Sequence, residues 1–599
     1  MDKLFNEFPP VSMQQWIDQI KKDLKSDDLS KIIRKTIDNL QIEPFYRKEN
    51  TENLPFLNSL PAKFPFLRGY KNHNKWAIRH NFIVKDLKKT VSEIENQNDR
   101  EIDIIGLQFG EKFNLSENQL LELIKGHKKI AFCAFENVED IFPMLEKFNL
   151  EQAFLNFDPF THLAFVGKNY KSEQETQNNI EKLISNSNEK YKTIGINTHH
   201  FANAGATPAQ QIAIALSIAA QYFDFATSKN IPLEKAIKNL WFTIGIGCEF
   251  FLEISKIRAF RYLYSKLIEA FDSNLKEKAI THIHGVTLKR NKTIYDSYSN
   301  MLRTSIEAFA GIVANVDSLS VIPFDAIYQT PNEFSNRIAI NQQIVLKNEA
   351  YADRYVDPAG GSYYVENLTN KLIETAWKLF LEIEQKGGYS KAIESNFIQN
   401  LVNEIVQKEK ANVETGKTPI LGTNKYPNVA ENLAELKIEK PLDISDLKKE
   451  NSTFTTLKTE RLAENFEQLR QKTEKSKKIP KVFMLTYGNT AMRRARADFS
   501  LNFFAVAGFK VIDNLGFDTV EAGIEAAMKE NADIIVLCSS DEEYTSMAQK
   551  CSTLNNKIIV VAGNPASRPE IEAIGIKNFI HVKSNLFAEL ANYQKLLNI

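Results

Sequence analysis

Apolar and polar positions along the chain repeat with two different periods, and the changes between them mark the predicted elements. Near the N-terminus, apolar residues from Trp16 onward recur at helical spacing, and Ser12 forms a capping box with Gln15. A second helix is predicted near residues 28–40. The two helices make up an N-terminal helical arm over residues 1–55. This arm cannot bury its own apolar stripes, so it is expected to lie on another surface, either in its own chain or in another subunit.

Over residues 56–404, short apolar runs alternate with longer amphipathic ones. The predicted strands are IDIIGLQF at 102–109, KIAFCAF at 129–135, HLAFVG at 162–167, TIGINTH at 193–199 and LSVIP at 319–323. The longest predicted helices cover residues 208–227 and 249–271. This α/β alternation predicts a parallel sheet, and a closed (β/α)8 TIM barrel is its most economical form. Periodicity alone does not separate a barrel from an open sheet.

Residues 481–599 repeat the alternation on a smaller scale. The predicted strands are VFMLTY, KVIDNL, ADIIVLC, KIIVVAG and KNFIHV, with helices near 490–507, 519–530, 541–553 and 567–574. Such steps in one domain-sized unit are typical of a flavodoxin-like doubly wound fold. Residues 405–480 are charged and rich in turns, and they are predicted to form a linker belt with a helix near 456–474.

Composition narrows the classes of function. Lys+Arg and Asp+Glu are equal at 75 each, which gives no argument for a nucleic-acid or membrane partner. The four cysteines form no CxxC pair, as expected for buried thiols in a reducing compartment. The start of the sequence has no secretory signal, and no run approaches the roughly 18 apolar residues of a membrane span. A cytoplasmic protein is expected.

The segment INTHHFANAGATPAQQ, which begins at residue 196, carries the richest candidate chemistry. His199 and His200 follow a predicted strand, at the end where barrel enzymes place reactive groups. Because neighbouring residues of a strand point to opposite faces, only one of the two is expected to face the lumen. A packed, hydrogen-bonded core histidine is favoured over a catalytic one. No metal site is predicted, since the chain has no HExxH motif.

Two other polar stretches are given structural interpretations. The run IGIGCEFFLEISKIRAFR places Glu249, Glu253 and Lys256 on one helix face, followed by two arginines. Salt bridges at i,i+3 and i,i+4 spacing are favoured over a catalytic role for them. In VDPAGGSYYVE, the glycine pair predicts a flexible turn, and Tyr363 and Tyr364 are expected on opposite faces of a strand.

The C-terminal unit has a turn in the usual position for a cofactor. In FMLTYGNTAMRRARADF, which begins at residue 483, a strand ends at the turn 487–490 and a helix follows. In open α/β sheets, the turn after the first strand is a favoured place to hold a cofactor. This turn contains neither His nor Cys, and its only glycine is Gly488. The domain is therefore shaped for a cofactor but lacks evident cofactor chemistry.

Several stretches resemble, in the same order, the methylmalonyl-CoA mutase family: INTHHFANAGAT, FTIGIGCEFFLEISKIRAFR, RTSIEAFAG, FSNRIAINQQIVLKNEA, DPAGGSYYVE and GTNKY. The similarity covers nearly the whole chain. The opening FPPVSMQQWIDQIKKDLKSDD resembles the start of the small (beta, non-catalytic) subunits of heterodimeric members. The resemblance implies interconversion of (R)-methylmalonyl-CoA and succinyl-CoA by a complex. In this family, acyl-CoA binds in the barrel, and the C-terminal domain holds adenosylcobalamin through the His of a DxHxxG turn.

The C-terminal domain departs from the catalytic members of that family. The turn that aligns with DxHxxG offers Gly488, Asn489, Thr490 and Met492, and the only His of the domain is His581, near the chain end. The resemblance therefore implies a degenerate cobalamin-binding domain. No cofactor is expected on this chain, and adenosylcobalamin is expected in a homologous large subunit.

The barrel segments depart from the catalytic pattern as well. The stretch from Arg68 to Trp76 is shorter than in catalytic members and has no clear match to their substrate-contacting Tyr. FDPFTHLAFVGKNY differs from the segment in which those members carry a carboxylate-binding Arg. His200 stands at the position of the family's active-site His, and His199 stands where the family has Tyr. The two histidines are thus vestigial barrel-mouth candidates, and no catalytic residue is expected.

The leading hypothesis is a non-catalytic small subunit that stabilises a homologous catalytic large subunit in a heterodimer. A second hypothesis is an active mutase with an unusual cobalamin site. A third is a cobalamin-free barrel enzyme or acyl-CoA-binding protein that uses His200. Purified protein would separate them. Colourless chain that co-elutes with a larger homologue supports the first, pink chain supports the second, and colourless chain that binds a CoA ester supports the third.

Overall fold

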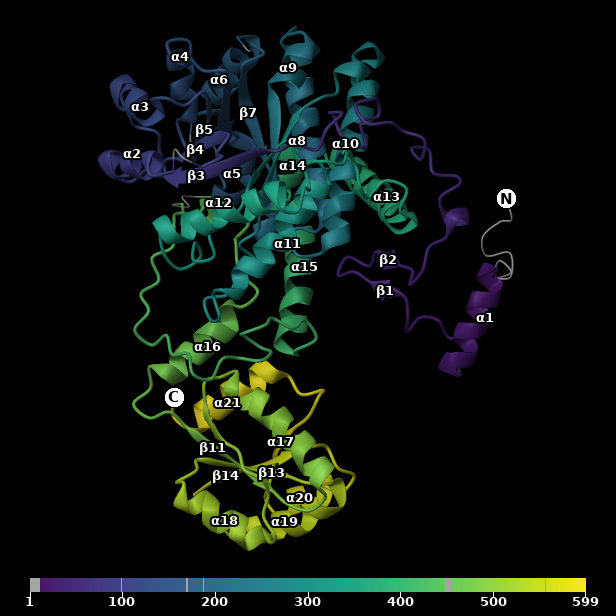
Figure 1. The fold of residues 1–599 in the computed structure, drawn as a ribbon, viewed down its shortest axis with the longest axis vertical. Coiled ribbons are helices and arrows are strands. Elements are labelled where there is room, and N and C mark those ends of the chain that lie inside the picture. The colour runs from purple at the N-terminus through teal and green to yellow at the C-terminus, as the bar shows by residue number, and fades with distance from the viewer. Residues whose placement is uncertain are drawn as a thin grey trace.

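A closed barrel of parallel strands forms the upper part of the molecule in Figure 1. The structure is a computed structural model that describes residues 11–97, 100–168, 171–186, 188–447, 452, 454–554 and 556–599. The barrel strands are β3 (Ala77–Ile83), β4 (Ile104–Gln108), β5 (Lys129–Cys133), β6 (Gln152–Phe157), β7 (Tyr191–Asn197), β8 (Leu240–Ile246), β9 (His282–Thr287) and β10 (Ser318–Ser320). They pair in sequence order, and β10 closes the barrel by pairing with both β9 and β3. The predicted (β/α)8 barrel is confirmed.

One predicted barrel strand is wrong. HLAFVG lies in the helix α5 (Pro159–Val166), and the strand of this repeat is β6, directly before it. Asp158 caps α5 by accepting a hydrogen bond from the backbone N–H of Thr161, and Pro159 occupies the first helical turn. A short apolar run does not separate a buried helix from a buried strand, and the Asp-Pro start selects the helix. Residues 169–170 of the same segment lie outside the described residues.

Most of the other helices of this unit cover the outside of the barrel, while α7 (Thr198–Asn203) lies at its mouth and α15 (Phe397–Glu414) extends towards the C-terminal unit. The others are α2 (Leu87–Glu95), α3 (Glu117–Ile124), α4 (Phe142–Leu145), α6 (Glu173–Ser185), α8 (Pro208–Ser228), α9 (Leu233–Asn239), α10 (Phe250–Phe271), α11 (Ser299–Val313), α12 (Glu333–Asn348), α13 (Tyr363–Gln385) and α14 (Gly388–Glu394), with 3-10 turns η1 (Lys48–Asn50), η2 (Val138–Ile141) and η3 (Ser273–Lys278). The helices predicted over 208–227 and 249–271 are confirmed as α8 and α10. The strand predicted at Tyr363 and Tyr364 is wrong, because Ser362 caps α13 there.

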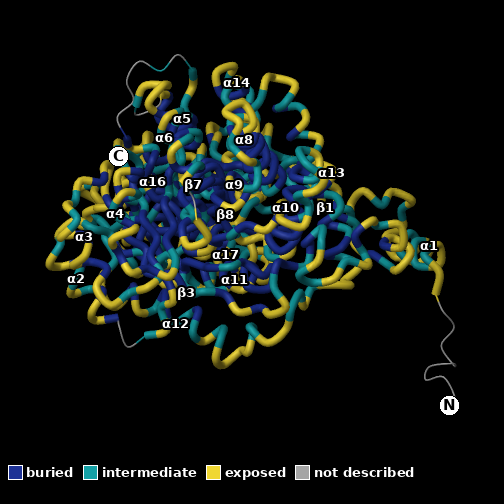
Figure 2. The backbone as a smooth tube through the Cα atoms, turned by 90° about the horizontal axis from the view of Figure 1, so that it is seen from above, coloured by how far each residue is buried: buried dark blue, intermediate teal, exposed yellow. Residues whose placement is uncertain are grey.

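The N-terminal arm holds one helix and a hairpin. α1 (Met13–Leu24) begins with the predicted capping box of Ser12 and Gln15, but the second predicted helix is the short hairpin of β1 (Arg34–Lys35) and β2 (Gln41–Ile42). A left-handed residue, Asn39, turns the chain between the two strands. α1 stands away from the barrel in both views and has no buried residue (Figures 1 and 2). Residues 1–10 of the predicted arm lie outside the described residues.

The C-terminal unit is a five-stranded parallel sheet in the order β12-β11-β13-β14-β15, which is the flavodoxin-like order. Its strands are β11 (Lys481–Thr486), β12 (Lys510–Ile512), β13 (Ile534–Cys538), β14 (Ile558–Ala562) and β15 (Asn578–Ile580). Its helices are α17 (Thr490–Ala505), α18 (Val520–Lys529), α19 (Tyr544–Cys551), α20 (Arg568–Ala573) and α21 (Leu586–Leu596), with the 3-10 turn η5 (Asp541–Glu543). Separate apolar clusters cover its two faces, so the predicted doubly wound fold is confirmed.

The belt connects the two units through side-chain contacts. It contains η4 (Ile444–Asp446) and α16 (Glu464–Glu474), which begins eight residues later than the helix predicted near 456–474. On one side, Glu467 Oε1 accepts a 2.8 Å hydrogen bond from the backbone N–H of Ile294, in the barrel unit. On the other side, Gln594 Nε2 donates to the carbonyl of Leu469. α16 therefore bridges the barrel and the C-terminal sheet, as Figure 1 shows.

Candidate active site at the mouth of the barrel

His199 and His200 lie on the short helix α7, one turn beyond the end of β7. Both side chains line the same cavity at the carboxyl ends of the strands. The prediction that only one of them faces the lumen is wrong, because α7 is a helix, where successive side chains are about 100° apart rather than opposed. Their ring centroids are 3.9 Å apart.

Burial controls the charge of both histidines. Burial lowers the pKa of the His200 imidazole to about 4. The Asp443 carboxylate acts in the opposite direction and raises this pKa, whereas the Lys289 ammonium lowers it further. Burial also lowers the pKa of His199 well below its usual range, with the neighbouring His200 adding to the effect. Within the described chain, neither Nδ1 atom has a hydrogen-bond partner. Both rings are neutral near pH 7, and no imidazolium is present to act as a general acid.

Large side chains fill the lumen below the histidines. Trp241 is almost fully buried, lies 5.4 Å from Phe154 by ring centroids and donates its indole N–H to the carbonyl of Leu155. Arg79 Cζ lies 5.7 Å from the centroid of the Trp241 ring, and the Arg79 guanidinium donates a 3.2 Å hydrogen bond to Cys133 Sγ. The cavity that remains measures about 130 Å³. Pockets for drug-sized ligands are about 300–1,000 Å³, so an acyl-CoA does not fit this cavity.

Hydrogen bonds order the polar groups that remain in the lumen. His282 Nε2 and His284 Nδ1 lie 2.7 Å and 2.9 Å from the hydroxyl oxygen of Ser318, which bridges them. Asn81 Oδ1 accepts from Arg79 Nε at 2.9 Å. Only a glycine at 106 leaves room for Asn81, because a Cβ there would lie 1.8 Å from its Oδ1. These bonds order most of the polar groups, but His284 Nε2 has no hydrogen-bond partner among the described residues.

The belt closes the mouth of the barrel. Leu442 and Asp443 line the cavity together with the two histidines. Lys289 Nζ donates to Asp443 Oδ2 at 3.2 Å, and Thr459 Oγ1 donates to Asp443 Oδ1 at 2.9 Å. Burial alone would raise the pKa of Asp443, but Lys289, His200 and the Thr459 hydroxyl together hold it well below its usual range. The carboxylate is therefore charged and fastened over the cavity.

A larger groove of about 650 Å³ lies beside this mouth. Its walls come from the arm hairpin, from the loops that follow β7, β8 and β9, and from α15. The arm is held there by an ion pair between Arg34 and Glu249, and the opposite wall carries an ion pair between Arg290 and Glu409. The groove and the lumen cavity share no lining residue. The two sites are therefore separate.

The charged face of α10 is structural. Lys256 pairs with Glu253 within the helix, as predicted, and also donates to the carbonyl of Gly245. The two arginines instead reach outside α10. Arg258 pairs with Asp357 and Glu366, while Arg261 donates to the carbonyls of residues 314 and 315. Their partners lie roughly 50 to 110 positions away in sequence, beyond the reach of helical spacing.

The turn that aligns with DxHxxG has no place for a cobalt-ligating imidazole. Asn489 is the N-cap of α17 and accepts from the backbone N–H of Met492. The helix starts at Thr490. Arg493 donates to the carbonyls of Gly488 and of residue 515, and a Cβ on residue 516 would lie 2.4 Å from its Cζ. A guanidinium thus fills the space beside the turn.

His581 does not replace the missing imidazole. It follows β15 at the edge of the sheet, and β13 and β14 lie between β15 and the strand that carries the turn. The residues present therefore do not fit protein ligation of adenosylcobalamin. In the part of the chain that the structure describes, no three His, Cys, Asp or Glu residues form a possible metal cluster.

Comparison with known proteins decides the family. The sequence profile described as methylmalonyl-CoA mutase matches residues 158–499. The chain is 37% identical to the methylmalonyl-CoA mutase small subunit of Porphyromonas gingivalis, over all of this chain and 99% of that protein. The chain belongs to the methylmalonyl-CoA mutase family. It is also 27% identical to the small subunit of Propionibacterium freudenreichii, over 90% of this chain and 86% of that protein.

Large subunits of the methylmalonyl-CoA mutase family match over a shorter stretch. The Porphyromonas gingivalis large subunit is 32% identical over 47% of this chain and 38% of that protein. The full-length matches therefore include small subunits of this family. No helix among the described residues is long and apolar enough to cross a membrane.

Sequence reasoning identified the two histidines but missed the residues that close the cavity. Arg79 lies on β3, a strand that was not predicted, and Asp443 lies in the belt. One local signal was present, since Asp443 begins the run DISD, in which it caps η4. That signal marks a helical turn, but it does not reveal a contact with Lys289, 154 positions away.

Proposed function

We propose that this chain is the non-catalytic small subunit of an adenosylcobalamin-dependent methylmalonyl-CoA mutase, in which it stabilises a homologous large subunit. The complex interconverts (R)-methylmalonyl-CoA and succinyl-CoA in the cytoplasm, with substrate and cofactor on the large subunit. In this proposal the chain consists of four units, which are the arm 1–55, the barrel 56–404, the belt 405–480 and the degenerate cobalamin domain 481–599.

The filled lumen carries this proposal. A barrel that acts on an acyl-CoA needs a channel for the substrate, whereas here Trp241 and Arg79 occupy the interior and a cavity of about 130 Å³ remains. The Asp443 carboxylate is fixed over that cavity. His200, at the family's active-site position, is neutral and lies between Phe135 and Phe165. The site keeps a family residue but lacks space for a substrate.

The C-terminal domain supports the same proposal. It keeps the flavodoxin-like sheet, whose stability comes from its two apolar faces and not from a ligand. The space beside the turn holds the Arg493 side chain, and the turn offers no imidazole. The domain then serves as a scaffold and contact surface, and the complex takes its cobalamin chemistry from the large subunit.

An exposed apolar band on the surface supports the proposal of a partner subunit. Leu302, Ile306 and Phe309 lie on one face of α11, and Tyr298 is its N-cap residue. The exposed fractions of Tyr298, Leu302, Ile306 and Phe309 are 61%, 67%, 53% and 38%. We call these four residues the α11 stripe. Isolated exposed apolar residues are ordinary on protein surfaces, but a continuous row of large ones marks an interaction surface.

The α11 stripe continues into the root of the arm through aromatic contacts. Phe309 stacks on Phe250, which contacts Phe251, and Phe251 contacts Tyr364 at 5.3 Å between ring centroids. Tyr364 in turn contacts Tyr46 of the arm. A homologous chain seated on the stripe would thus also meet the arm, whose helix α1 is otherwise uncovered. Arm and stripe form one surface suited to a large, obligate partner.

Co-purification with a large subunit tests the proposal. The chain is co-expressed with a homologous large subunit that carries DxHxxG, and each is also purified alone. We expect one heterodimer peak with mutase activity, and a colourless, inactive chain on its own. A pink or active isolated chain would support an active mutase instead. A colourless isolated chain that binds a CoA ester and never joins the large subunit would support the acyl-CoA-binding alternative.

A further inference from the structure

The α11 stripe has a geometry that suits pairing with a copy of itself. Tyr298, Leu302 and Ile306 follow one another at intervals of four residues, and the N-cap Tyr298 keeps a helical backbone. Residues at this interval form a continuous ridge along a helix, and two such ridges interlock at about 50° in the commonest class of helix packing. Phe309 extends the ridge by about one turn. Because these side chains are exposed in the single chain, the ridge is available for such packing.

The charged residues of α11 do not oppose this pairing. They are Arg303 and Glu307. Glu307 is fully buried and pairs with Lys292 at 2.7 Å. Arg303 donates to Asn300 Oδ1 and to the carbonyl of residue 421, which holds it against its own chain. Like charges that face each other are the usual obstacle to pairing two copies of one surface, and both charges of α11 are engaged within the chain.

Aromatic side chains widen the stripe at its N-terminal end. Tyr298 contacts Phe324 at 5.1 Å between ring centroids. Phe324 in turn contacts Phe334, a half-exposed residue at the start of α12. The apolar surface at this end therefore continues from α11 to the neighbouring helix.

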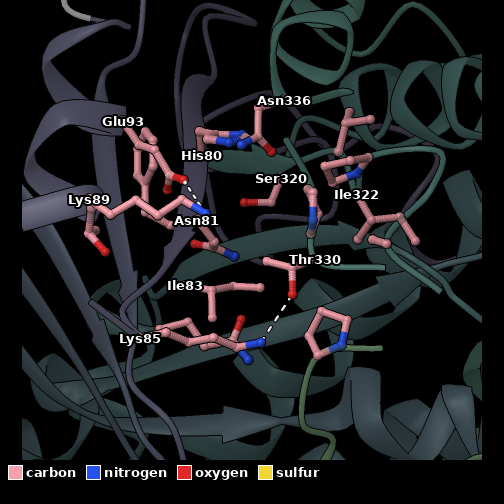
Figure 3. A pocket seen from close by; sticks show the side chains of 18 of the residues that line it. His80, Asn81, Ile83, Lys85, Lys89, Glu93, Ser320, Ile322, Thr330 and Asn336 are labelled. Carbon is pink, nitrogen blue, oxygen red and sulfur yellow. Dashed lines mark hydrogen bonds and ion pairs between the residues drawn. The ribbon is translucent and has the colours of Figure 1, made fainter. Parts of the chain in front are cut away.

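The outer side of α12 extends this surface further along α11. Gln342 Nε2 of α12 donates to the carbonyl of Met301 at 2.6 Å, which joins the two helices. Val345, less than one turn further along α12, is exposed. The buried side of α12 faces the barrel, as Figure 3 shows for Asn336 beside His80 of β3. An apolar patch that spans two helices is typical of an interaction surface, unlike single exposed residues.

The partner in the proposed function is a homologous chain, and this favours a symmetric contact. Oligomers of like chains most often pair around a two-fold axis, and such an interface uses the same patch on both members. A large subunit that meets the α11 stripe with its own corresponding helix would select a stripe shaped for a surface of its own kind. A second copy of this chain presents the same ridge.

We propose that, without the large subunit, two copies of this chain pair through their α11 stripes around a two-fold axis close to Leu302 and Ile306. These two residues are the central members of the stripe. The large subunit displaces one copy when the heterodimer forms, because both partners use one face. This pairing presupposes the proposed function, in which the partner is a homologue.

Sedimentation equilibrium of the isolated full chain tests the pairing. We expect a reversible monomer–dimer equilibrium with a Kd on the order of 10 µM. Leu302→Glu with Ile306→Glu should raise this Kd at least about a hundredfold, because two charges would be buried at the contact. Leu121→Glu, at an exposed leucine of α3, is the matched control and should leave the Kd unchanged. A wild-type chain that stays monomeric up to about 100 µM, ten times the expected Kd, would overturn the pairing. A dimer that the double substitution leaves intact would overturn it too.

Cysteine cross-linking tests the two-fold axis. Cys248 is first replaced by Ser, because its side chain is exposed. A residue beside a two-fold axis lies close to its own copy, within the roughly 7 Å between Cα atoms that a disulfide spans. Under a mild oxidant, Leu302→Cys or Ile306→Cys should therefore link two copies, and Leu121→Cys should not. Equal linking at all three positions, or none at either stripe position, would contradict the axis. This readout uses no buried charge, so it also serves where the glutamate variant does not fold.

Adding the large subunit separates this pairing from the proposed function. Excess large subunit should suppress the cross-link, and a cross-link that persists while the heterodimer forms would show that the two partners use different faces. A monomeric chain that joins the large subunit would overturn the pairing and leave the proposed function intact. A chain that dimerises through the stripe but never joins the large subunit would uphold the pairing and refute the proposed function.

Discussion

Lys289 Nζ lies 3.2 Å from Asp443 Oδ2, at the cavity that His199 and His200 also line. One partner directly follows the seventh barrel strand and the other belongs to the belt. This ion pair therefore holds the belt over the barrel mouth. It also keeps the charged Asp443 carboxylate in the lining of the candidate site.

Asp443→Asn is expected to destabilise the chain by about 1–2 kcal/mol, less than the roughly 3–5 kcal/mol for breaking a fully buried pair, because Lys289 is one-third exposed. Denaturant midpoints are measured for wild type, Asp443→Asn, Lys289→Met and the double variant. Together they give the coupling free energy between the Asp443 and Lys289 side chains. Lys125→Met, at an exposed position at the end of α3, is the control and should have no effect. Additive single effects would contradict a direct pair.

The same carboxylate predicts a dependence on pH. The folded-state pKa of Asp443 is held below its unfolded value of about 3.9 by Lys289, His200 and Thr459, against the effect of burial. Its stabilisation is complete above that unfolded pKa and is lost as pH falls through the lower folded-state pKa. Wild type should therefore lose more stability than Asp443→Asn between about pH 5 and pH 2, measured by denaturant midpoints. Parallel curves would refute the assignment.

A buried network fixes the segment after α12. Arg258 pairs with Asp357 and Glu366, and Arg68 reaches the same two carboxylates at 2.7 and 3.3 Å. Arg258→Met leaves buried carboxylates short of a cation and should cost about 3–5 kcal/mol. Arg354→Met, at an exposed arginine beside Asp353, should cost less than about 1 kcal/mol. A similar loss in both variants would contradict the network.

His200→Ala should leave turnover of the reconstituted complex nearly unchanged. The ring is neutral and lies between aromatic rings, and the cavity that it lines, of about 130 Å³, is too small for an acyl-CoA. Activity at saturating methylmalonyl-CoA, with gel filtration to verify assembly, gives the result. A fall of more than about a hundredfold without dissociation, the scale for losing a general acid or base, would show that the chain takes part in catalysis.

Titration of the isolated chain with adenosylcobalamin should leave the visible spectrum of the cofactor unchanged at micromolar concentration. Ligation through protein needs a neutral imidazole held by a second group, and the turn at Gly488, Asn489, Thr490 and Met492 has none. A large subunit with DxHxxG is the positive control. Stoichiometric binding would remove the argument for a non-catalytic chain.

Substitution on the α11 stripe should release the large subunit. Leu302→Glu with Ile306→Glu places two charges at the centre of the stripe and should raise the Kd of the heterodimer at least about a hundredfold. The isolated chain should keep its stability, since both side chains are exposed. Leu121→Glu, at an exposed leucine on α3, is the control. Deleting residues 1–40 should also release the partner, and unchanged binding would show that the arm has another role.

Local sequence patterns determined much of this protein. The strand–helix alternation, the capping boxes at Ser12 and Thr207 and the five short strands after residue 481 each depend on residues a few positions apart. These patterns predicted a parallel sheet, with the barrel as its most economical form, and a flavodoxin-like doubly wound domain. The missing imidazole in the turn after β11 was also visible, because ligand chemistry depends on residue type.

Tertiary structure alone decided the rest. The chain near residues 28–40 is a hairpin against the barrel rather than a helix, whereas the helix at HLAFVG follows from a local signal that the prediction overlooked, the Asp158 cap. The filled lumen depends on Trp241 and Arg79, which come from different strands, and its closure depends on Asp443, 154 residues after its partner Lys289. Periodicity records which face of an element is buried, but not which distant side chain it meets. Whether the barrel holds a substrate channel is therefore set by long-range packing.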